Sequence, residues 1–221
     1  MSTSTSGAEV RYTFVSLATR NEPAVQYGAT TMVSGARFAE LGDRMVNTRL
    51  AGADDLPALK QLMDAAIGEL QAGFLAPHEV VASRGVMGID TQLVADGTYF
   101  VAEIDGALAG CGGWSRRATL YGGDHSTSLR DSALLDPARD CARVRAMYTH
   151  PNFTRRGVGR AILAAAENAA RAEGFSCVEL MATLAGEPLY LACGYREVER
   201  TFSPPVDGVP VPMVKMRKPI T

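Results

Sequence analysis

The sequence has little excess charge of either sign and no apolar run that approaches the length of a membrane span. Its 22 basic and 24 acidic residues give a formal net charge of −2 over 221 residues, so nothing in the charge favours nucleic acid as a partner. The N-terminus lacks the charged and apolar regions of a signal peptide. These absences predict a cytoplasmic protein that binds neither nucleic acid nor a membrane.

The cysteines are few and widely spaced, and no two of them form a Cys-x-x-Cys motif. Each lies among apolar or small residues, so we expect buried free thiols in a reducing cytosol. Neither the cysteines nor the three histidines cluster as zinc ligands do, so no metal is expected. The four cysteines are Cys111, Cys141, Cys177 and Cys193.

Clear periodic patterning begins only at Met45. The length and the 47% hydrophobic content fit one domain with an ordinary core, which we assign to residues 45–221. Residues 1–44 are then an N-terminal extension, partly disordered at its Ser/Thr-rich start and with a weak strand pattern at residues 10–17. The alternative is upstream sequence read through from an earlier start.

The order of the remaining elements predicts an α+β fold with a mixed sheet. It reads strand, helix, helix, hairpin, strand, helix, strand, helix, hairpin. The dipeptide Asp105-Gly106 predicts a primed hairpin turn. The strand that follows contains Gly110, Gly112 and Gly113, which indicate a bulge or a close backbone neighbour. The long polar segment 115–140 is typical of a functional or mobile loop, and it is a candidate cover for an acceptor site.

The most informative stretch joins a strand at residues 142–149 to a helix that begins at Val158. Glycines leave room for a ligand, the helix start offers free N–H groups, and arginines add positive charge, so the turn predicts a phosphate or pyrophosphate site. A helix start with convenient glycines and solvated arginines is the open alternative. Neither a Walker loop nor a dinucleotide fingerprint fits. The residues of the turn are Thr154, Arg155, Arg156, Gly157, Val158, Gly159 and Arg160.

This turn resembles the acyl-CoA-binding motif of the GNAT superfamily of N-acetyltransferases. That motif is Gln or Arg, two residues, Gly, one residue, then Gly or Ala, and residues 156–161 satisfy it literally. A second frame takes Gly157 and Gly159 as the usual glycine pair, with Thr154 in place of Gln or Arg. Two further stretches resemble the family, the hairpin at residues 105–110 and the helix at residues 187–195, and the resemblance covers residues 45 to 218.

The resemblance implies a mixed, mostly antiparallel sheet with a splayed central pair of strands and flanking helices. It implies an enzyme that moves an acetyl group from acetyl-CoA, its cosubstrate, to a primary amine of a small molecule or peptide by direct attack. The backbone of Met147, Tyr148 and Thr149 would pair with the pantetheine arm and polarise the acetyl carbonyl. Tyr190 would protonate the departing thiolate. Ordinary sheet pairing and a packed tyrosine are the plain structural alternatives.

The general base stays undetermined. Glu103, Glu179, His150 and His125 are candidates, acting directly or through water. Thr183 stands where the family often has Asn, which weakens any inference about how the last helix is tied to the cofactor. The acceptor and the oligomeric state, including a homodimer, are open. The rival functions are a non-catalytic acyl-CoA-binding sensor or regulatory module and a nucleotide-binding domain that uses the same anion site.

Overall fold

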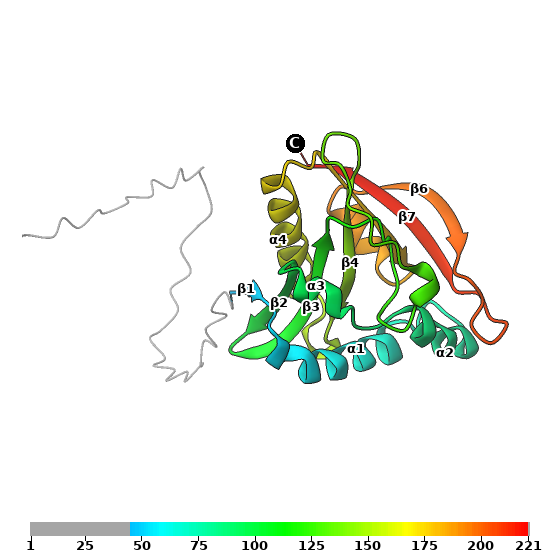
Figure 1. Ribbon diagram of the computed structural model, residues 1–221. Coiled ribbons are helices and arrows are strands. Elements are labelled where there is room, and N and C mark those ends of the chain that lie inside the picture. Colours follow the sequence, from blue (N-terminus) through cyan, green and yellow to red (C-terminus); the bar gives the residue numbers. More distant parts are fainter. Residues whose placement is uncertain (1–44, 221) are drawn as a thin grey trace, which may run out of the picture. The chain divides into compact units, whose positions relative to one another are not determined.

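The computed structural model describes residues 45–220, which form a seven-stranded sheet with helices on both faces (Figure 1). The strand order is β1-β2-β3-β4-β5-β7-β6, and β4 and β5 are the parallel pair in an otherwise antiparallel sheet. The predicted mixed, mostly antiparallel sheet is confirmed. The strand pattern at residues 10–17 lies outside the described residues. The strands are β1 (Asn47–Leu50), β2 (Tyr99–Ile104), β3 (Ala107–Ser115), β4 (Ala142–Thr149), β5 (Cys177–Thr183), β6 (Arg196–Phe202) and β7 (Pro212–Pro219).

Five α-helices connect these strands, with short 3-10 turns at three places in the described chain. The longest two each have an apolar stripe at helical spacing, which gives them one buried face. The helices are α1 (Leu56–Leu70), α2 (Pro77–Val86), α3 (Thr91–Ala95), α4 (Val158–Ala172) and α5 (Glu187–Ala192), and the 3-10 turns are η1 (Ala53–Asp55), η2 (Thr127–Leu129) and η3 (Pro151–Phe153).

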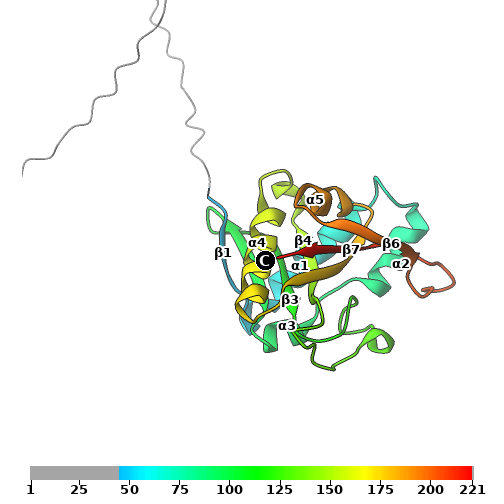
Figure 2. The ribbon, with the colours of Figure 1, turned by 90° about the horizontal axis from the view of Figure 1, so that it is seen from above.

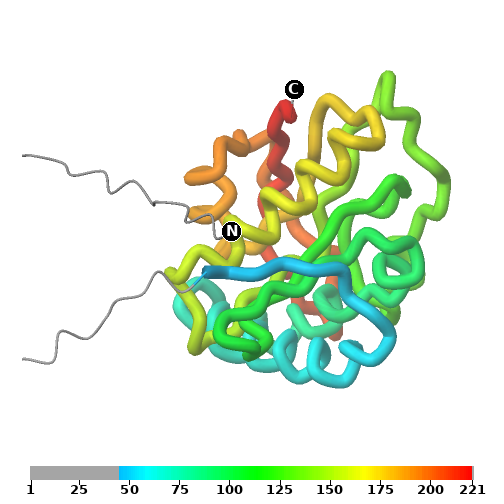
Figure 3. Tube along the Cα trace, turned by 90° about the vertical axis from the view of Figure 1, so that its left-hand side faces the viewer, coloured from blue at the N-terminus to red at the C-terminus, as the bar shows by residue number. Residues whose placement is uncertain are grey.

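Helices α1 and α4 cover opposite faces of the sheet. Along β2, Tyr99 and Val101 pack with the buried stripe of α1, whereas Ala102 and Ile104 pack with the start of α4. Figure 3 views the sheet from its β1 edge, with α4 (yellow) and α1 (cyan) on either side of β1. At the other edge, the Glu187 carboxylate of α5 pairs with Arg200 of β6 at 2.5 Å, and α5 lies beside the β6–β7 hairpin (Figure 2).

The turn between β2 and β3 has the primed geometry that its sequence predicts, with φ 53° at Asp105 and 77° at Gly106. The glycines of β3 allow two close approaches. A Cβ on Gly110 would lie 2.4 Å from Val158 Cγ1 of α4, and one on Gly112 would lie 2.2 Å from Met147 Sδ of β4. The expectation of a bulge or a close neighbour at these glycines is therefore confirmed.

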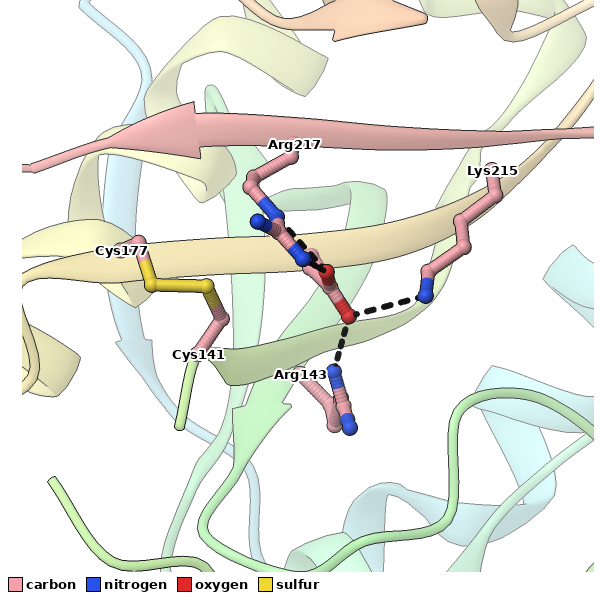
Figure 4. The surroundings of a disulfide bond; sticks show 6 residues. Cys141, Arg143, Cys177, Lys215 and Arg217 are labelled. Atoms are coloured by element: carbon pink, nitrogen blue, oxygen red, sulfur yellow. Dashed lines mark hydrogen bonds and ion pairs between the residues drawn. A yellow bond between two sulfur atoms is a disulfide. The ribbon is translucent and has the colours of Figure 1, made fainter. Parts of the chain in front are cut away.

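A disulfide joins Cys141 to Cys177, at the start of the two parallel strands (Figure 4). The expectation of four free thiols is wrong for this pair, while Cys111 and Cys193 are free. The two residues stand 36 positions apart in the sequence, and their Cα atoms are 4.7 Å apart because β5 returns beside β4. Spacing along the chain does not reveal a pairing that only the strand order creates.

Next to the disulfide, three cationic side chains surround the carboxylate of Glu179 on β5 (Figure 4). Arg143 of β4 pairs with one oxygen, and Lys215 Nζ of β7 lies 3.4 Å from the same oxygen. Arg217 Nε donates to the other oxygen at 2.7 Å. Burial alone would raise the pKa of Glu179, but the hydrogen bonds and charges of these cations outweigh it, so the pKa lies below its ordinary value. The carboxylate therefore ties β4, β5 and β7 together.

Candidate active site

The parallel pair β4–β5 separates soon after it forms. Its ladder consists of Ala142 opposite Val178 and Arg143 opposite Glu179, and β5 then continues with β7 as far as Thr183. In the described part of the chain, the edge of β4 that faces β5 has no strand partner beyond Arg143. The backbone groups on that edge therefore make no ladder with β5 beyond this point, as the splayed central pair implied by the resemblance requires.

A bulge distorts β4 at this point. Arg145 pairs with Gly113 of β3 and Tyr148 pairs with Cys111, so Ala146 and Met147 together oppose one residue of β3. Ala146 has φ 51°, which is uncommon for a residue with a side chain, and the Tyr99 hydroxyl donates to its carbonyl at 2.7 Å. A bulge re-aims the backbone around it. It does so here at Met147 and Tyr148, two of the residues expected to hold the thioester.

A cavity of about 100 Å³ opens between the separated strands. Met147 and Tyr148 line it from β4, and Tyr190 lines it from α5, so the structure brings three of the expected site residues together. Thr149 lies one residue further along β4, outside the lining. The rest of the wall comes from the end of α2, the long segment before β4, and β4, β5 and β7, and consists of Val86, Met87, Gly88, Leu120, Tyr121, Gly122, Val144, Arg145, Ala146, Met181, Thr183, Gly186 and Met213.

The ring of Tyr190 is packed tightly by its neighbours. Its ring meets the ring of Tyr195 edge-on, with centroids 5.7 Å apart, and it packs against Gly186, where a Cβ would lie 3.0 Å from the ring. The side chain is buried, and burial raises the pKa of its hydroxyl well above the ordinary value. The hydroxyl therefore keeps its proton at neutral pH.

The turn before α4 presents unused donors. Gly157 has φ 81° and stands at the N-cap without a side-chain cap. The N–H groups of Val158, Gly159 and Arg160 have no acceptor among the hydrogen bonds of residues 45–220. The two glycines have different roles. Positive φ requires the first, beside which a Cβ would meet open space, whereas a Cβ on Gly159 would lie 2.7 Å from Leu189 Cδ2 of α5.

Three arginines supply the positive charge of this turn. Arg155, Arg156 and Arg160 are exposed, and within the described residues no ion pair joins them to a carboxylate. Arg156 lies over the ring of Phe153, with its guanidinium carbon 5.2 Å from the ring centroid. Three exposed cations beside N–H groups without an acceptor among the described residues form a site that suits a pyrophosphate. These donors match what acetyl-CoA would need.

Neither histidine among the base candidates lines the cavity. His150 Nδ1 accepts a hydrogen bond from Asn152 N at 3.2 Å and caps η3. His125 Nε2 lies 2.9 Å from the carbonyl oxygen of Gly85. Both rings thus have local structural roles.

The two carboxylate candidates are also committed elsewhere. Glu103, on β2, accepts a hydrogen bond from Arg49 Nε at 3.1 Å. The carboxylate of Glu179 is enclosed by Arg143, Lys215 and Arg217. Within residues 45–220, no Asp or Glu lines the cavity and no cluster of three or more His, Cys, Asp or Glu side chains could hold a metal. None of the named side chains is therefore placed to take a proton from an acceptor amine directly.

Several lining residues carried no functional signal in the sequence. Leu120 and Tyr121 lie in the aperiodic segment before β4, and Met181 and Met213 read as ordinary strand residues. The length of the segment 115–140 was the feature of the sequence that indicated a function for it.

No helix in the described part of the chain is long and apolar enough to cross a membrane.

Comparisons with known proteins agree with this geometry. Residues 61–195 match the acetyltransferase (GNAT) family. A GCN5-related N-acetyltransferase from Rhodopseudomonas palustris has 18% identity and a TM-score of 0.58, over 79% of this chain and 95% of that one. YncA from Salmonella typhimurium, solved with acetyl-CoA, is 17% identical to this chain with a TM-score of 0.55. The match covers 80% of this chain and 95% of YncA. PaiA N-acetyltransferase from Thermoplasma acidophilum, in complex with coenzyme A, is 15% identical to this chain with a TM-score of 0.52. The match covers 79% of this chain and 99% of PaiA. A comparison with curated proteins finds no match.

Proposed function

The chain belongs to the GNAT family of acetyltransferases and uses acetyl-CoA as its cosubstrate, and we propose that it transfers the acetyl group to a primary amine by direct attack. The observation that carries this proposal is the cavity at the open edge of β4. Met147 and Tyr148 of β4 line it, and so does Tyr190 of α5. The β4 backbone can hold the acetyl carbonyl, and the Tyr190 hydroxyl can supply a proton to the thiolate sulfur of coenzyme A.

The turn before α4 is the proposed pyrophosphate site. Its free N–H groups and the three arginines Arg155, Arg156 and Arg160 would bind the phosphates and leave the thioester to run along the unpaired edge of β4. Thr154 precedes the arginines in this turn, and Thr149 is the last residue of β4. Acetyl-CoA supplies an acetyl group already activated by its bond to sulfur.

The chain's own groups would then act in sequence. The backbone of Met147, Tyr148 and Thr149 polarises the acetyl carbonyl while the neutral amine attacks it. The carbon–nitrogen bond forms, the carbon–sulfur bond breaks, and Tyr190 gives its proton to the departing thiolate. The excess proton on nitrogen leaves through water, and Tyr190 regains its proton from the same solvent. The products are an N-acetyl amine and coenzyme A, with no covalent enzyme intermediate.

Release of free coenzyme A across an amine library tests the activity, with calorimetric titration of acetyl-CoA run beside it. Amine-dependent thiol release at a steady rate supports the proposal. Binding of acetyl-CoA without release by any amine would instead point to a sensor or regulatory module. Displacement of acetyl-CoA by ATP at comparable concentrations would point to a nucleotide-binding domain.

We further propose that residues 45–221 form the catalytic domain and that residues 1–44 are an extension dispensable for cofactor binding. The match to the family begins within that domain, at residue 61. A chain that starts at Met45 should fold and bind acetyl-CoA as the full chain does, and insolubility would assign residues 1–44 to the fold or to an obligate oligomer. Size measurement of the same sample tests the homodimer, which stays a proposal.

We propose that the protein is cytoplasmic. This location predicts that the disulfide is only partly formed in the cell. Reducing compartments keep most thiols unpaired, so the bond between Cys141 and Cys177 would form there only partially. Alkylation of free thiols in freshly lysed cells, followed by mass spectrometry, measures the paired fraction. A fully paired population would argue for an oxidising compartment.

A further inference from the structure

One wall of the cavity, made of residues outside β4 and α5, has mostly apolar side chains. It combines the end of α2, the long segment before β4, and side chains of β5 and β7. No residue of this wall carries a formal charge, and its hydroxyls belong to Tyr121 and Thr183. Its apolar side chains are those of Val86, Met87, Leu120, Met181 and Met213.

Among the described residues, the one cation that lines the cavity is Arg145, and its charge is already paired. Arg145 Nη1 lies 2.6 Å from a carboxylate oxygen of Asp90, and Arg145 Nη2 donates to the carbonyl oxygen of Gly122 at 2.6 Å. Asp90 is fully buried, and its other carboxylate oxygen accepts from Arg130 at 2.9 Å. Arg145 is therefore committed to a buried network and has little to offer the carboxylate of a ligand.

We infer that the acceptor is a primary amine whose far end is apolar and uncharged, which deepens the proposed function and rests on it. A second ammonium would enter a wall with no carboxylate, and a carboxylate would meet only a cation that is already paired. Burying either charge without a partner is strongly unfavourable. Methionine side chains adapt to irregular shapes, so the wall should accept linear and aromatic apolar groups alike.

The same wall assists the chemistry of the attacking nitrogen. An apolar surrounding disfavours the ammonium form of an amine and so lowers its pKa. More of the bound amine is then neutral and able to attack the thioester, even though no carboxylate or histidine among the described residues reaches the cavity. Polyamines and amino acids would lose this benefit, because their second charge keeps the bound amine partly hydrated.

Three amines of nearly equal length test the inference on the full chain with saturating acetyl-CoA. They are hexylamine, 1,5-diaminopentane and 5-aminopentanoate, which differ mainly at the far end. We expect kcat/KM for hexylamine to exceed the other two by at least about a hundredfold, and 2-phenylethylamine to rank with hexylamine. A kcat/KM for 1,5-diaminopentane or 5-aminopentanoate equal to that for hexylamine would overturn the inference and leave the amine acetyltransferase standing. Binding of acetyl-CoA with no turnover of any of the four amines would overturn both.

A matched pair of substitutions in the wall tests its cause. Leu120→Glu places a carboxylate in the wall, whereas Leu120→Gln places a neutral side chain of nearly the same shape. We expect Glu to lower kcat/KM for hexylamine and raise it for 1,5-diaminopentane, so that their ratio falls at least about tenfold relative to the Gln protein. Equal ratios in the two proteins, with acetyl-CoA affinity intact in both, would assign the preference to another part of the molecule.

Discussion

The two ends of the β4–β5 pair are held by very different interactions. At the closed end, residues 141–143 and 177–179, the strands share a disulfide, two ladder positions and the ion pairs of Glu179. At the open end, residues 146–149 and 181–183, the described chain has no ladder between them, β4 bulges, and a cavity separates the strands. Strands β4 and β5 are thus covalently linked right beside the point where they stop pairing.

This difference explains how a sheet can keep an unpaired edge in its middle. Exposed edges invite pairing or collapse, and a parallel pair with a two-position ladder is a weak restraint by itself. A covalent bond and a buried ion cluster at the closed end fix the angle between the strands. The open end can then stay unpaired until the amide groups of a ligand bind to it. The following changes separate the two ends.

The largest effect should come from Tyr190→Phe at the open end. The ring and its contact with Tyr195 remain, so the melting temperature and the acetyl-CoA affinity should change little. One proton donor is lost, and general acid catalysis is typically worth about 10²–10⁴-fold, so turnover should fall by that factor. Turnover with a confirmed acceptor is the measurement.

Tyr195→Phe is the matched control. It removes a phenolic hydroxyl from the other ring of the same pair, outside the lining of the cavity, and should leave turnover near the normal rate. Near-normal turnover in Tyr190→Phe would mean that water or another residue protonates the thiolate. Equal losses of stability and affinity in that variant would reduce Tyr190 to a packing residue.

The next effect concerns the closed end. Replacing Cys141 and Cys177 together by Ser should lower the free energy of unfolding by about 2–4 kcal/mol, because the disulfide no longer restrains the unfolded chain. Acetyl-CoA affinity should fall by only a few-fold, since the ladder and the ion pairs of Glu179 remain. Denaturant unfolding and calorimetry measure the two quantities.

Reductant supplies the control. It should bring the wild-type protein to the stability of the double variant and leave the double variant unchanged, while Cys193→Ser, which alters a free thiol, should respond to reductant as the wild type does. A double variant as stable as the wild type would show that the bond does not form in solution.

The sequence could predict the open end better than the closed end. The change from alternation before Thr149 to helical spacing after Val158 indicates a strand, a turn and a helix, and the glycines of β3 indicate the bulge. Those signals are local. The disulfide and the cations around Glu179 come from segments far apart in the chain, and only the strand order β4-β5-β7 brings them together.

Choosing site residues by chemical type had the same limitation. Glu179 and His125 have the right functional groups for a base, but their neighbours engage them elsewhere. Leu120 and Met213 line the cavity without any distinctive pattern in the sequence. The prediction that Tyr190 is the general acid rests on the family resemblance, because a tyrosine in a short helix has no period or charge that marks a catalytic role.

A pair of arginines sharpens the comparison further. Arg156→Ala should weaken acetyl-CoA binding by about tenfold, flatten its dependence on salt and leave the melting temperature unchanged, because the side chain is exposed and pairs with no carboxylate of residues 45–220. Arg143→Ala removes a partner of buried Glu179 and should lower the melting temperature while acetyl-CoA affinity stays the same. If both substitutions act on the same quantity, the two ends are not independent. Calorimetry at two salt concentrations and thermal unfolding decide between these outcomes.

The smallest effect should be the acid sensitivity of the closed end. Because the pKa of Glu179 lies below its ordinary value of 4.5 in the folded protein, the unfolded chain takes up this proton first as the pH falls. The stabilisation from Glu179 is therefore fully present above about pH 4.5 and is lost as the pH falls through the folded pKa. In Glu179→Gln, this loss cannot occur. Free energies of unfolding plotted against pH should run parallel for the two proteins above pH 4.5, with the wild type higher, and should converge below it. Curves that stay parallel throughout would mean that the three cations contribute nothing specific to Glu179, and that the disulfide with its short ladder holds the closed end alone.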